Sequence, residues 1–296
     1  QVMHGDRVLV RLEKRRNREV QGHVTNVLER GQRRLVGTVQ ADGDRTLVIP
    51  MDPRIGTAIP LVATEPVHTG QVVAVEMTRY ATGYTPPEAR LHQSLGSPDD
   101  PEVQTQAVIF RYDWPKDFSD EAQREAEGHD AAIDPASLHG RRDLRPLTTF
   151  TVDGETARDF DDAVSIERTE TKAYRLYVSI ADVAHYVPRG SFLDSEAYTR
   201  GTSVYFPDRA LPMLPHQLSN GVCSLKPRTD RLARTVLLEI NHSGEVERTE
   251  LFRSTIHSNA RLTYTEVAQI LVDEDPSVIQ NYPELIEPLR VMEELT

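Results

Sequence analysis

Cysteine is almost absent from this sequence of 296 residues, in which Cys223 stands alone. No intrachain disulfide can therefore form, which suits a reducing cytoplasm. The sequence also lacks any run of the ~20 apolar residues that a helix needs to cross a bilayer, and its polar, arginine-rich start does not resemble a signal peptide. These absences argue against secreted and membrane proteins, and they predict a cytoplasmic protein with no membrane partner.

Basic residues are in the minority: the sequence has 34 of them and 46 acidic residues, so its net charge is −12. That balance argues against a protein whose whole surface binds nucleic acid. Residues 1–37 depart from it, with nine basic residues against four acidic ones. The basic residues of this N-terminal stretch are Arg7, Arg11, Lys14, Arg15, Arg16, Arg18, Arg30, Arg33 and Arg34. They form either the solvated face of a hairpin or a local stripe that follows a phosphate backbone, since electrostatic attraction is short-ranged at physiological salt.

An alternation of apolar and polar residues occurs twice in the N-terminal part of the chain. Residues 5–12 and 70–77 share this pattern 65 residues apart, and alternation predicts a half-buried strand. Short strands at such spacing are typical of antiparallel barrels of about five strands. The other strands expected in this region cover residues 22–28, 34–39, 46–50 and 89–95.

The first copy of the repeat begins four residues after Gln1, whereas strands precede the second copy. We therefore expect a first barrel that is present only in its C-terminal part, in a chain that begins inside a longer protein. The alternative is an entry of only two strands, which is marginally stable in water unless it packs on a neighbour. The last predicted helix covers residues 283–295 and has proline at its first position. No capping glycine follows before Thr296, so we expect that the chain also stops inside a longer protein at this end.

From about residue 148 onward, strand and helix patterns mix. The predicted strands cover residues 174–180 and 235–240, and the predicted helix 266–271 places Val267, Ile270 and Leu271 on one face. A further helix is expected over residues 119–127, with Ser119 as its N-terminal cap and acidic residues in its first turn. Together with the barrels, these elements predict an α+β fold.

Four aspartates fall within ten residues, namely Asp153, Asp159, Asp161 and Asp162. Carboxylates gathered in one folded site repel one another, and some of them would stay protonated at neutral pH. A divalent cation removes this cost, since Mg²⁺ prefers hard oxygen ligands, and two such ions can clamp the attacking and leaving oxygens of a phosphodiester. The alternative is an acidic surface loop, which the aspartates alone do not exclude.

The segment around these aspartates, Asp-Gly-Glu-Thr-Ala-Arg-Asp-Phe-Asp-Asp-Ala-Val at residues 153–164, resembles the signature of the ribonuclease II / ribonuclease R (RNB) family of 3′-to-5′ exoribonucleases. The N-terminal repeats are similar to the paired cold-shock domains of that family, which are barrels of the oligonucleotide-binding (OB) type. The resemblance thus covers nearly the whole chain. Further similar blocks follow in the family's order at residues 180–187, 201–207, 212–215, 218–225 and 260–264.

The resemblance implies cold-shock barrels followed by the first half of a mixed α/β RNB catalytic domain. The family's catalytic domain continues beyond this point and is followed by a third barrel, so we expect a chain that lacks both ends of the family pattern, with its C-terminal half missing or supplied as a separate chain. The expected parts are the end of a first barrel, a second barrel, a helical connector and the start of the catalytic domain, at residues 1–34, 35–112, 113–147 and 148–296.

Carried over to the matching positions, the resemblance implies that Asp153 and Asp162 bind the main Mg²⁺, for which Mn²⁺ can substitute. Asp159 would support this ion or a second one. Asp161 would be the aspartate most critical to the chemistry. In hydrolytic phosphoryl transfer, positioning and charge neutralisation account for most of the reduction of the activation barrier.

Two tyrosines correspond to RNA-contacting aromatic residues of the family. Tyr205 matches the one that stacks near the 3′ end of the RNA, and Tyr264 matches a second. Stacking accepts any base, which suits an enzyme without sequence preference; outside these motifs, either tyrosine would be interpreted as a core or edge residue. Ser179 stands where the family pattern has histidine, whereas His185 is expected to be structural and Cys223 a small buried hydrophobe.

The implied function is Mg²⁺-dependent, processive hydrolysis of single-stranded RNA from its 3′ end to nucleoside 5′-monophosphates, by a monomeric enzyme. One alternative is an RNA-binding fragment or truncated relative without catalytic activity of its own, whose aspartates are structural. Another is a metal-dependent nuclease that acts on DNA. Mg²⁺ binding separates the first alternative from the enzyme, and matched RNA and DNA oligonucleotides test the second.

Overall fold

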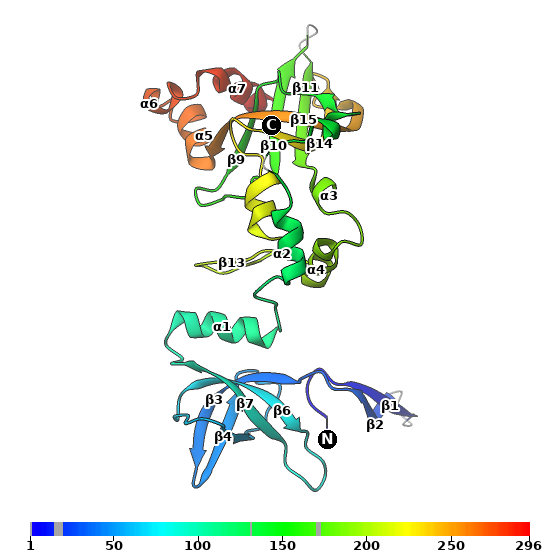
Figure 1. Ribbon diagram of the computed structural model, residues 1–296, viewed down its shortest axis with the longest axis vertical. Helices are drawn as coiled ribbons and strands as arrows, with labels where there is room; N and C mark the ends of the chain where they lie inside the picture. Colours follow the sequence, from blue (N-terminus) through cyan, green and yellow to red (C-terminus); the bar gives the residue numbers. More distant parts are fainter. Residues whose placement is uncertain (1, 15–19, 131, 170–172) are drawn as a thin grey trace. The chain divides into compact units, whose positions relative to one another are not determined.

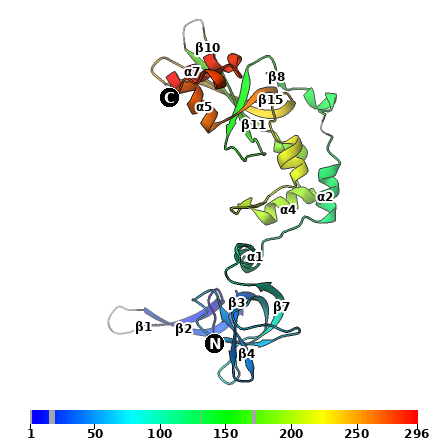
Figure 2. The ribbon, with the colours of Figure 1, turned by 90° about the vertical axis from the view of Figure 1, so that its left-hand side faces the viewer.

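A computed structural model describes most of the chain (Figures 1 and 2). The described residues are 2–14, 20–130, 132–169 and 173–296. The chain divides into two compact units, residues 1–116 and 117–296, and each is described by itself. Arg15, Arg16 and Arg18 of the basic stretch lie outside the described residues. No helix in the described part of the chain is long and apolar enough to span a membrane.

The first unit consists of strands and a single helix among its described residues. Five of its strands form a closed barrel in the order β3–β4–β5–β7–β6. The six strands that alternation predicts are confirmed, whereas β5, which is only four residues long, went unpredicted. The elements are β1 (Arg7–Lys14), β2 (Val20–Glu29), β3 (Arg34–Asp42), β4 (Arg45–Pro50), β5 (Ile59–Val62), β6 (Val72–Arg79), β7 (Glu88–Gly96) and α1 (Pro101–Arg111).

Strand β6 is buried on both of its faces. Val73 and Val75 fill the barrel interior, whereas Val72 packs with Val103 and Ala107 of α1 on the outside. Helix α1 was not predicted from the sequence, although it carries ordinary start signals: Asp100 accepts a hydrogen bond from a backbone N–H of the first turn, and proline stands at the first helical position. The helix therefore covers a second apolar face of the barrel.

The hairpin of β1 and β2 forms a separate two-stranded sheet beside the barrel (Figure 1). Leu9, Leu12 and Leu28 are exposed on it. Met3, which precedes the hairpin, packs against the barrel core. In the described part of the chain, two strands thus stand where the sequence predicts the end of a first barrel.

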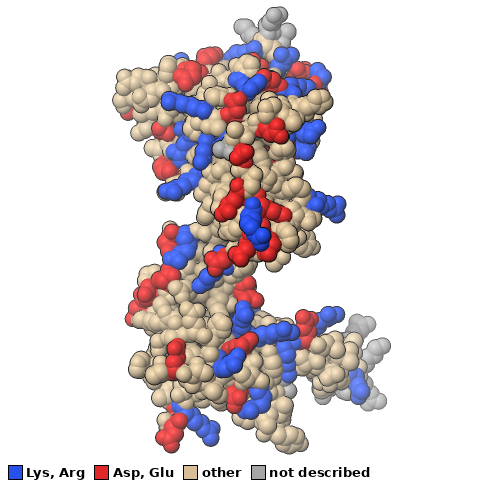
Figure 3. Space-filling model, in the orientation of Figure 1, with Lys and Arg blue, Asp and Glu red and all other residues tan. Residues whose placement is uncertain are grey.

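Several basic residues of the N-terminal stretch already have acidic partners. Arg30 binds Asp6 at 2.8 Å and its guanidinium lies over the ring of Tyr80. Arg34 pairs with Asp113, and Figure 3 shows acidic and basic side chains mixed over this unit. These pairings favour a structural role for Arg30 and Arg34 over a continuous phosphate-binding stripe.

The second unit is built on a six-stranded sheet in the order β14–β11–β10–β9–β15–β8, with an additional pairing of β14 and β15. The predicted strands and helices of this region are confirmed, except that the last α-helix begins at Ile286, after a 3₁₀ turn over Pro283–Leu285, and not at Pro283. The strands are β8 (Arg142–Asp143), β9 (Thr149–Asp153), β10 (Asp162–Arg168), β11 (Tyr174–Ala181), β12 (Val204–Tyr205), β13 (Ala210–Leu211), β14 (Asp230–Ile240) and β15 (Val246–Thr263). The helices are α2 (Asp120–Glu127), α3 (Val183–Tyr186), α4 (Phe192–Arg200), α5 (Tyr264–Leu271), α6 (Pro276–Ile279) and α7 (Ile286–Leu295), with shorter helical turns at η1 (Pro135–Leu138), η2 (Leu218–Val222) and η3 (Pro283–Leu285).

Two of the apolar clusters in this unit position the aspartate segment. One contains Phe150 of β9, Leu262 of β15 and Leu289 of α7, on the side where α5 and α7 lie in Figures 1 and 2. The other joins α2 and α4 to the η2 segment and to the ends of β11 and β14. The aspartate segment leaves the sheet where these two cores meet, because Phe150 of β9 belongs to one and Phe160 to the other.

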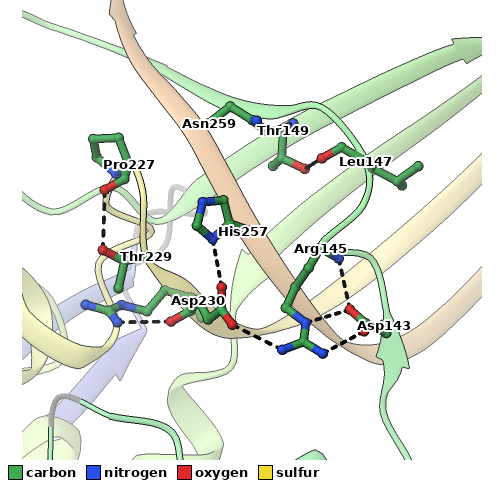
Figure 4. Close-up of polar contacts among 10 residues, drawn as sticks. Asp143, Arg145, Leu147, Thr149, Pro227, Thr229, Asp230, His257 and Asn259 are labelled. Atoms are coloured by element: carbon green, nitrogen blue, oxygen red, sulfur yellow. Dashed lines mark hydrogen bonds and ion pairs between the residues drawn. The ribbon is translucent and has the colours of Figure 1, made fainter.

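A chain of polar contacts ties β8 to β14 and β15 (Figure 4). The guanidinium of Arg145 donates two hydrogen bonds to the carboxylate of Asp143, at 2.7 and 2.8 Å, and a third to Asp230 at 3.2 Å. Asp230 also lies 2.7 Å from Nδ1 of His257. These contacts hold β8 and the residues that follow it against β14 and β15.

Candidate functional site

The topology brings several strand ends to one edge of the sheet. Asp153 ends β9 and Asp162 begins β10, which runs antiparallel to it. Strand β15 runs parallel to β9 and pairs Thr263 with Asp153, so that Tyr264, the next residue, starts α5 at the same edge. The loop that carries Asp159 and Asp161 joins β9 to β10, as expected if the aspartates form a single site.

This loop is anchored at its C-terminal end. Phe160 is buried, its N–H donates to Oγ of Ser224 at 3.1 Å, and its carbonyl accepts from the N–H of Leu225 at 2.8 Å. The Ser224 hydroxyl is also 3.0 Å from the carbonyl of Arg158. The carbonyl of Asp161 accepts from Ala181 of β11 at 2.9 Å. The aspartates therefore project from a backbone that other parts of the unit hold in place.

The carboxylates influence one another's protonation. Burial raises the pKa of Asp161 above its ordinary value, and the negative charges of Asp159, Asp162 and Asp153 raise it further. The pKa of Asp153 is also raised, first by burial and then by the negative charges of Asp162 and Asp159, whereas the positive charge of Arg261 opposes this rise. The site therefore favours any partner that brings positive charge.

The donor set fits a hard divalent cation. Oδ2 of Asp153 is buried without a hydrogen-bond partner among the described residues, and a buried carboxylate oxygen is costly to leave unpaired. The four side chains offer carboxylate oxygens, which are the ligands that Mg²⁺ prefers. No three acidic, histidine or cysteine side chains in the described ranges are already gathered at metal-ligand spacing. Binding of a cation would thus have to draw these carboxylates together.

A cleft of about 550 Å³ connects the aspartate segment to the β12–β13 ribbon. Asp159 and Arg158 line one side, and Tyr205 and Arg209 line the other. The aromatic side chain of Tyr205 is 70% exposed. An aspartate and a tyrosine that the sequence places far apart therefore face one cleft, together with two arginines that could attract a phosphate.

Tyr264 lies elsewhere on the same sheet edge and does not line this cleft. It is 67% exposed at the first position of α5. The next residue, Thr265, donates a hydrogen bond to Glu155 in the aspartate segment at 2.6 Å. The two predicted tyrosines thus flank the aspartates from different elements.

The structure also uses residues that sequence reasoning did not select. Ser224 and Arg261 hold the aspartate segment through backbone contacts, and His216 and Asn220 line the cleft beside Tyr205. Ser224, Arg261 and Asn220 fall inside the blocks that resemble the family, at 218–225 and 260–264. Their position in those blocks was the available signal, since a contact to a backbone carbonyl leaves no pattern in the local sequence.

Three other residues named in the sequence analysis, Ser179, His185 and Cys223, do not line the cleft and have hydrogen bonds or buried positions elsewhere in the unit. Ser179 is buried, and its hydroxyl lies 2.7 Å from that of Thr235, which is 2.6 Å from the hydroxyl of Ser254. Nε2 of His185 is 3.2 Å from the Ser137 hydroxyl. Cys223 is buried as expected, and burial raises the pKa of its thiol to about 12.

Comparison with known families supports the architecture. The RNB domain family matches residues 141–296, and the cold-shock domain family matches residues 47–119. The chain is 42% identical to ribonuclease R of Thermotoga maritima over 95% of this chain and 40% of that protein. It is 38% identical to ribonuclease R of Aquifex aeolicus over 99% of this chain and 42% of that protein. The chain therefore spans about 40% of the length of these two relatives.

Solved structures give the same result for the fold. Ribonuclease R of Mycoplasma genitalium in complex with ribose-methylated single-stranded RNA superposes with a TM-score of 0.85 at 26% identity, over 99% of this chain and 47% of that chain. Yeast Ssd1, described as a pseudonuclease, superposes with a TM-score of 0.69 at 17% identity, over 95% of this chain and 36% of that chain, and so shares the fold alone.

The expected α+β architecture, with a barrel of the cold-shock type and an RNB domain, is therefore confirmed. The RNB match covers more than half of the chain, and the two relatives compared above are named ribonuclease R. This chain belongs to the ribonuclease II / ribonuclease R (RNB) family.

Proposed function

We propose that the chain carries the aspartate site of a Mg²⁺-dependent exoribonuclease that hydrolyses single-stranded RNA processively from its 3′ end to nucleoside 5′-monophosphates. The observation that carries this proposal is the buried Oδ2 of Asp153, which has no hydrogen-bond partner among the described residues and lies in a segment with three further aspartates. Membership of the RNB family supplies the substrate class. The proposal extends to a cytoplasmic, monomeric enzyme, whose remaining catalytic residues lie in a further segment or a separate chain.

In this proposal, Asp153 and Asp162 hold the main Mg²⁺, and Asp159 and Asp161 complete the acidic set. Mn²⁺ can replace Mg²⁺, because it accepts the same oxygen ligands. When bound, the cation would offset part of the negative charge of the four carboxylates and would polarise the scissile phosphate. Asp161 accepts a hydrogen bond from the attacking water at its carboxylate and orients that water toward phosphorus.

Tyr205 and the arginines of the cleft bind the end of the RNA. The exposed ring of Tyr205 offers a face on which any base can stack, and base–aromatic stacking contributes about 1–3 kcal/mol per base. Arg158 and Arg209 attract the phosphates that follow. Tyr264 contacts a further nucleotide from the other side of the aspartates.

The first test is incubation of the chain with 5′-labelled single-stranded RNA in Mg²⁺ and in EDTA. A ladder that shortens from the 3′ end only in Mg²⁺ would support the proposed activity. A DNA oligonucleotide of matched sequence should stay intact, and its degradation would favour the DNA nuclease instead.

In the complete protein, Asp161→Asn removes the charge of the proposed water-orienting carboxylate with little change in shape. We expect cleavage to fall by more than about 10³-fold, on the scale of other losses in preorganised catalytic sites, while the RNA still binds in a gel-shift assay. Asp44→Asn, the same change in an exposed turn of the first unit, is the control and should cleave as the parent does. Full activity of Asp161→Asn would exclude the proposed role.

The second candidate function is RNA binding without catalysis. It is favoured by the spacing of the carboxylates, since no three acidic, histidine or cysteine side chains in the described ranges are gathered as metal ligands. It predicts RNA that is shifted on a gel but stays intact in Mg²⁺, and no cation bound by the aspartates. Mg²⁺ titration by calorimetry, with Asp153→Asn as the comparison, separates the two candidates.

A further inference from the structure

Arg261 lies near the C-terminal end of β15, next to the aspartate segment. The strand runs parallel to β9, and Arg261 is paired in register with Thr151, two residues before Asp153. Since the aspartate segment starts where β9 ends, the side chain of Arg261 stands close to both the first aspartate and the turn that follows it.

The guanidinium of Arg261 contacts both ends of this segment. One terminal nitrogen donates a hydrogen bond to the carbonyl of Gly154, directly after Asp153. Its central carbon lies 5.5 Å from the centre of the Phe160 ring, between Asp159 and Asp161. A planar, permanently charged group that can donate several hydrogen bonds and stack on a ring suits this double contact, whereas the compact ammonium of lysine does not.

Arg261 also brings positive charge to an acidic place. Nε of Arg261 is buried without a hydrogen-bond partner among the described residues. The carboxylates of Asp153, Glu155 and Glu266 all experience the attraction of its guanidinium. The side chain therefore has electrostatic interactions with the site in addition to its two structural contacts.

We propose that Arg261 is a positioning residue of the cation site: it holds the start and the end of the segment 154–160, and thereby sets the spacing of the four aspartates. The inference rests on the proposed function for its cation, but its geometry is that of the protein alone. Groups that orient metal ligands from outside typically contribute 10- to 100-fold to metal affinity.

The test compares the chain with Arg261→Gln and Arg261→Lys, and uses Arg142→Gln as the matched control. Arg142 makes the same kinds of contact elsewhere in the unit, because its guanidinium lies 3.7 Å from the centre of the Phe252 ring and donates to Glu250 at 2.9 Å. Two quantities are measured on each protein: Mn²⁺ affinity by electron paramagnetic resonance, and hydrogen exchange of the backbone amides of residues 154–160.

We expect Arg261→Gln to weaken Mn²⁺ binding by about 10- to 100-fold and to speed amide exchange, most clearly at Phe160. Arg261→Lys keeps the charge and should recover only part of the affinity, because it cannot span both contacts. Arg142→Gln should bind Mn²⁺ as the parent does. The same loss of affinity in Arg142→Gln would indicate a general loss of structure and overturn the inference.

Mn²⁺ affinity within twofold of the parent and unchanged exchange in Arg261→Gln would also overturn it. If Arg261→Gln does not fold, the lysine variant decides: parental affinity and parental exchange would reduce the role of Arg261 to its charge. If the parent chain itself binds no Mn²⁺, the proposed cation site fails, and the exchange rates alone decide whether Arg261 holds the segment.

Discussion

The hairpin and the barrel of the first unit start from the same sequence pattern and end in different environments. Val10 and Val75 occupy matching positions of the repeat, as do Leu12 and Met77. Val75 is completely buried and Met77 is 8% exposed, whereas Val10 is 41% exposed and Leu12 is 69% exposed. Alternation thus determines that a strand forms and which residues share its face, but it does not determine whether that face is covered.

The number of strands explains the difference. Five strands close around Val75, and α1 covers the outer face of its strand, so that water is excluded from both sides. The two strands of the hairpin cannot enclose anything, and an isolated pair of strands is marginally stable in water. In the described residues, Met3 packs against the barrel core and Arg30 lies over the ring of Tyr80, which packs there too, so both residues join this end of the chain to the barrel.

The largest difference in the free energy of unfolding is expected between alanine variants of the matched residues Met77 and Leu12. Met77→Ala removes buried atoms and leaves a cavity, so the free energy of unfolding should fall by about 2–5 kcal/mol. Leu12→Ala should change it by about 0.5 kcal/mol or less, because this side chain is already in water. Denaturation followed by the fluorescence of Trp114, the sole tryptophan and a residue of the first unit, measures both values. Equal losses would mean that the hairpin face is covered in solution.

Two glycines extend the comparison to the backbone. A Cβ at Gly37 of β3 would overlap the carbonyl oxygen of Ile49, whereas at Gly22 of β2 the nearest obstacle is the exposed side chain of Val10. Gly37→Ala should therefore destabilise the barrel by about 1–3 kcal/mol, because a backbone must move. Gly22→Ala should cost about 0.5 kcal/mol or less, since Val10 can turn away. Thermal unfolding of the two variants, read by tryptophan fluorescence, would contradict this contrast if the midpoints fell equally.

Acid should destabilise the barrel through Asp52. Hydrogen bonds from Arg54 lower the pKa of this carboxyl well below its ordinary value of 3.8, and the charge of Arg111 adds to the effect. A lowered pKa in the folded state means that the stabilisation is complete above pH 3.8 and is lost as the pH falls below it. In Asp52→Asn, the unfolding midpoint should therefore depend less on pH below 3.8 than in the parent. Arg111→Gln should lie between them, and identical profiles would rule out this role.

The smallest effect is expected from an exposed ion pair of the hairpin. Arg7 and Glu29 approach to 4.0 Å with both side chains largely in water. Such pairs contribute about 0–1 kcal/mol, and salt screens them. A double-mutant cycle with Arg7→Ala and Glu29→Ala should give a coupling below about 0.5 kcal/mol. A larger coupling that persists in 1 M salt would indicate that the hairpin is buried against another surface.

Much of the fold followed from local patterns. The alternating segments became β1 and β6, and Ser119 caps α2 as its sequence indicates, by accepting a hydrogen bond from the N–H of Ala122. The helix α1 and the short strand β5 escaped prediction. In α1, Val103 and Ala107 cover the barrel, but the continuous apolar run from Ala107 to Phe110 does not follow a helical spacing, so no single apolar face stands out in the sequence.

Part of the candidate site could likewise be predicted from the sequence, and part of it could not. The four aspartates lie in one short segment, so their nearness along the chain is plain from the sequence, and Asp153 is the last residue of β9. The partners of that segment could not be predicted, because Ser224 and Arg261 reach it through backbone carbonyls and amides. Their contacts depend on the path of the chain between distant elements rather than on residue type.

The sequence by itself determined the family, the presence of strands and helices, and the placement of four aspartates in one short segment, because each depends on residues that are neighbours along the chain. Only the tertiary structure decided which alternating strand is buried, that Asp159 and Tyr205 face one cleft, and that Arg261 supports the aspartate segment. These outcomes depend on the pairing of β9 with β15 and on the closure of five strands, and both are set by contacts between residues far apart in sequence.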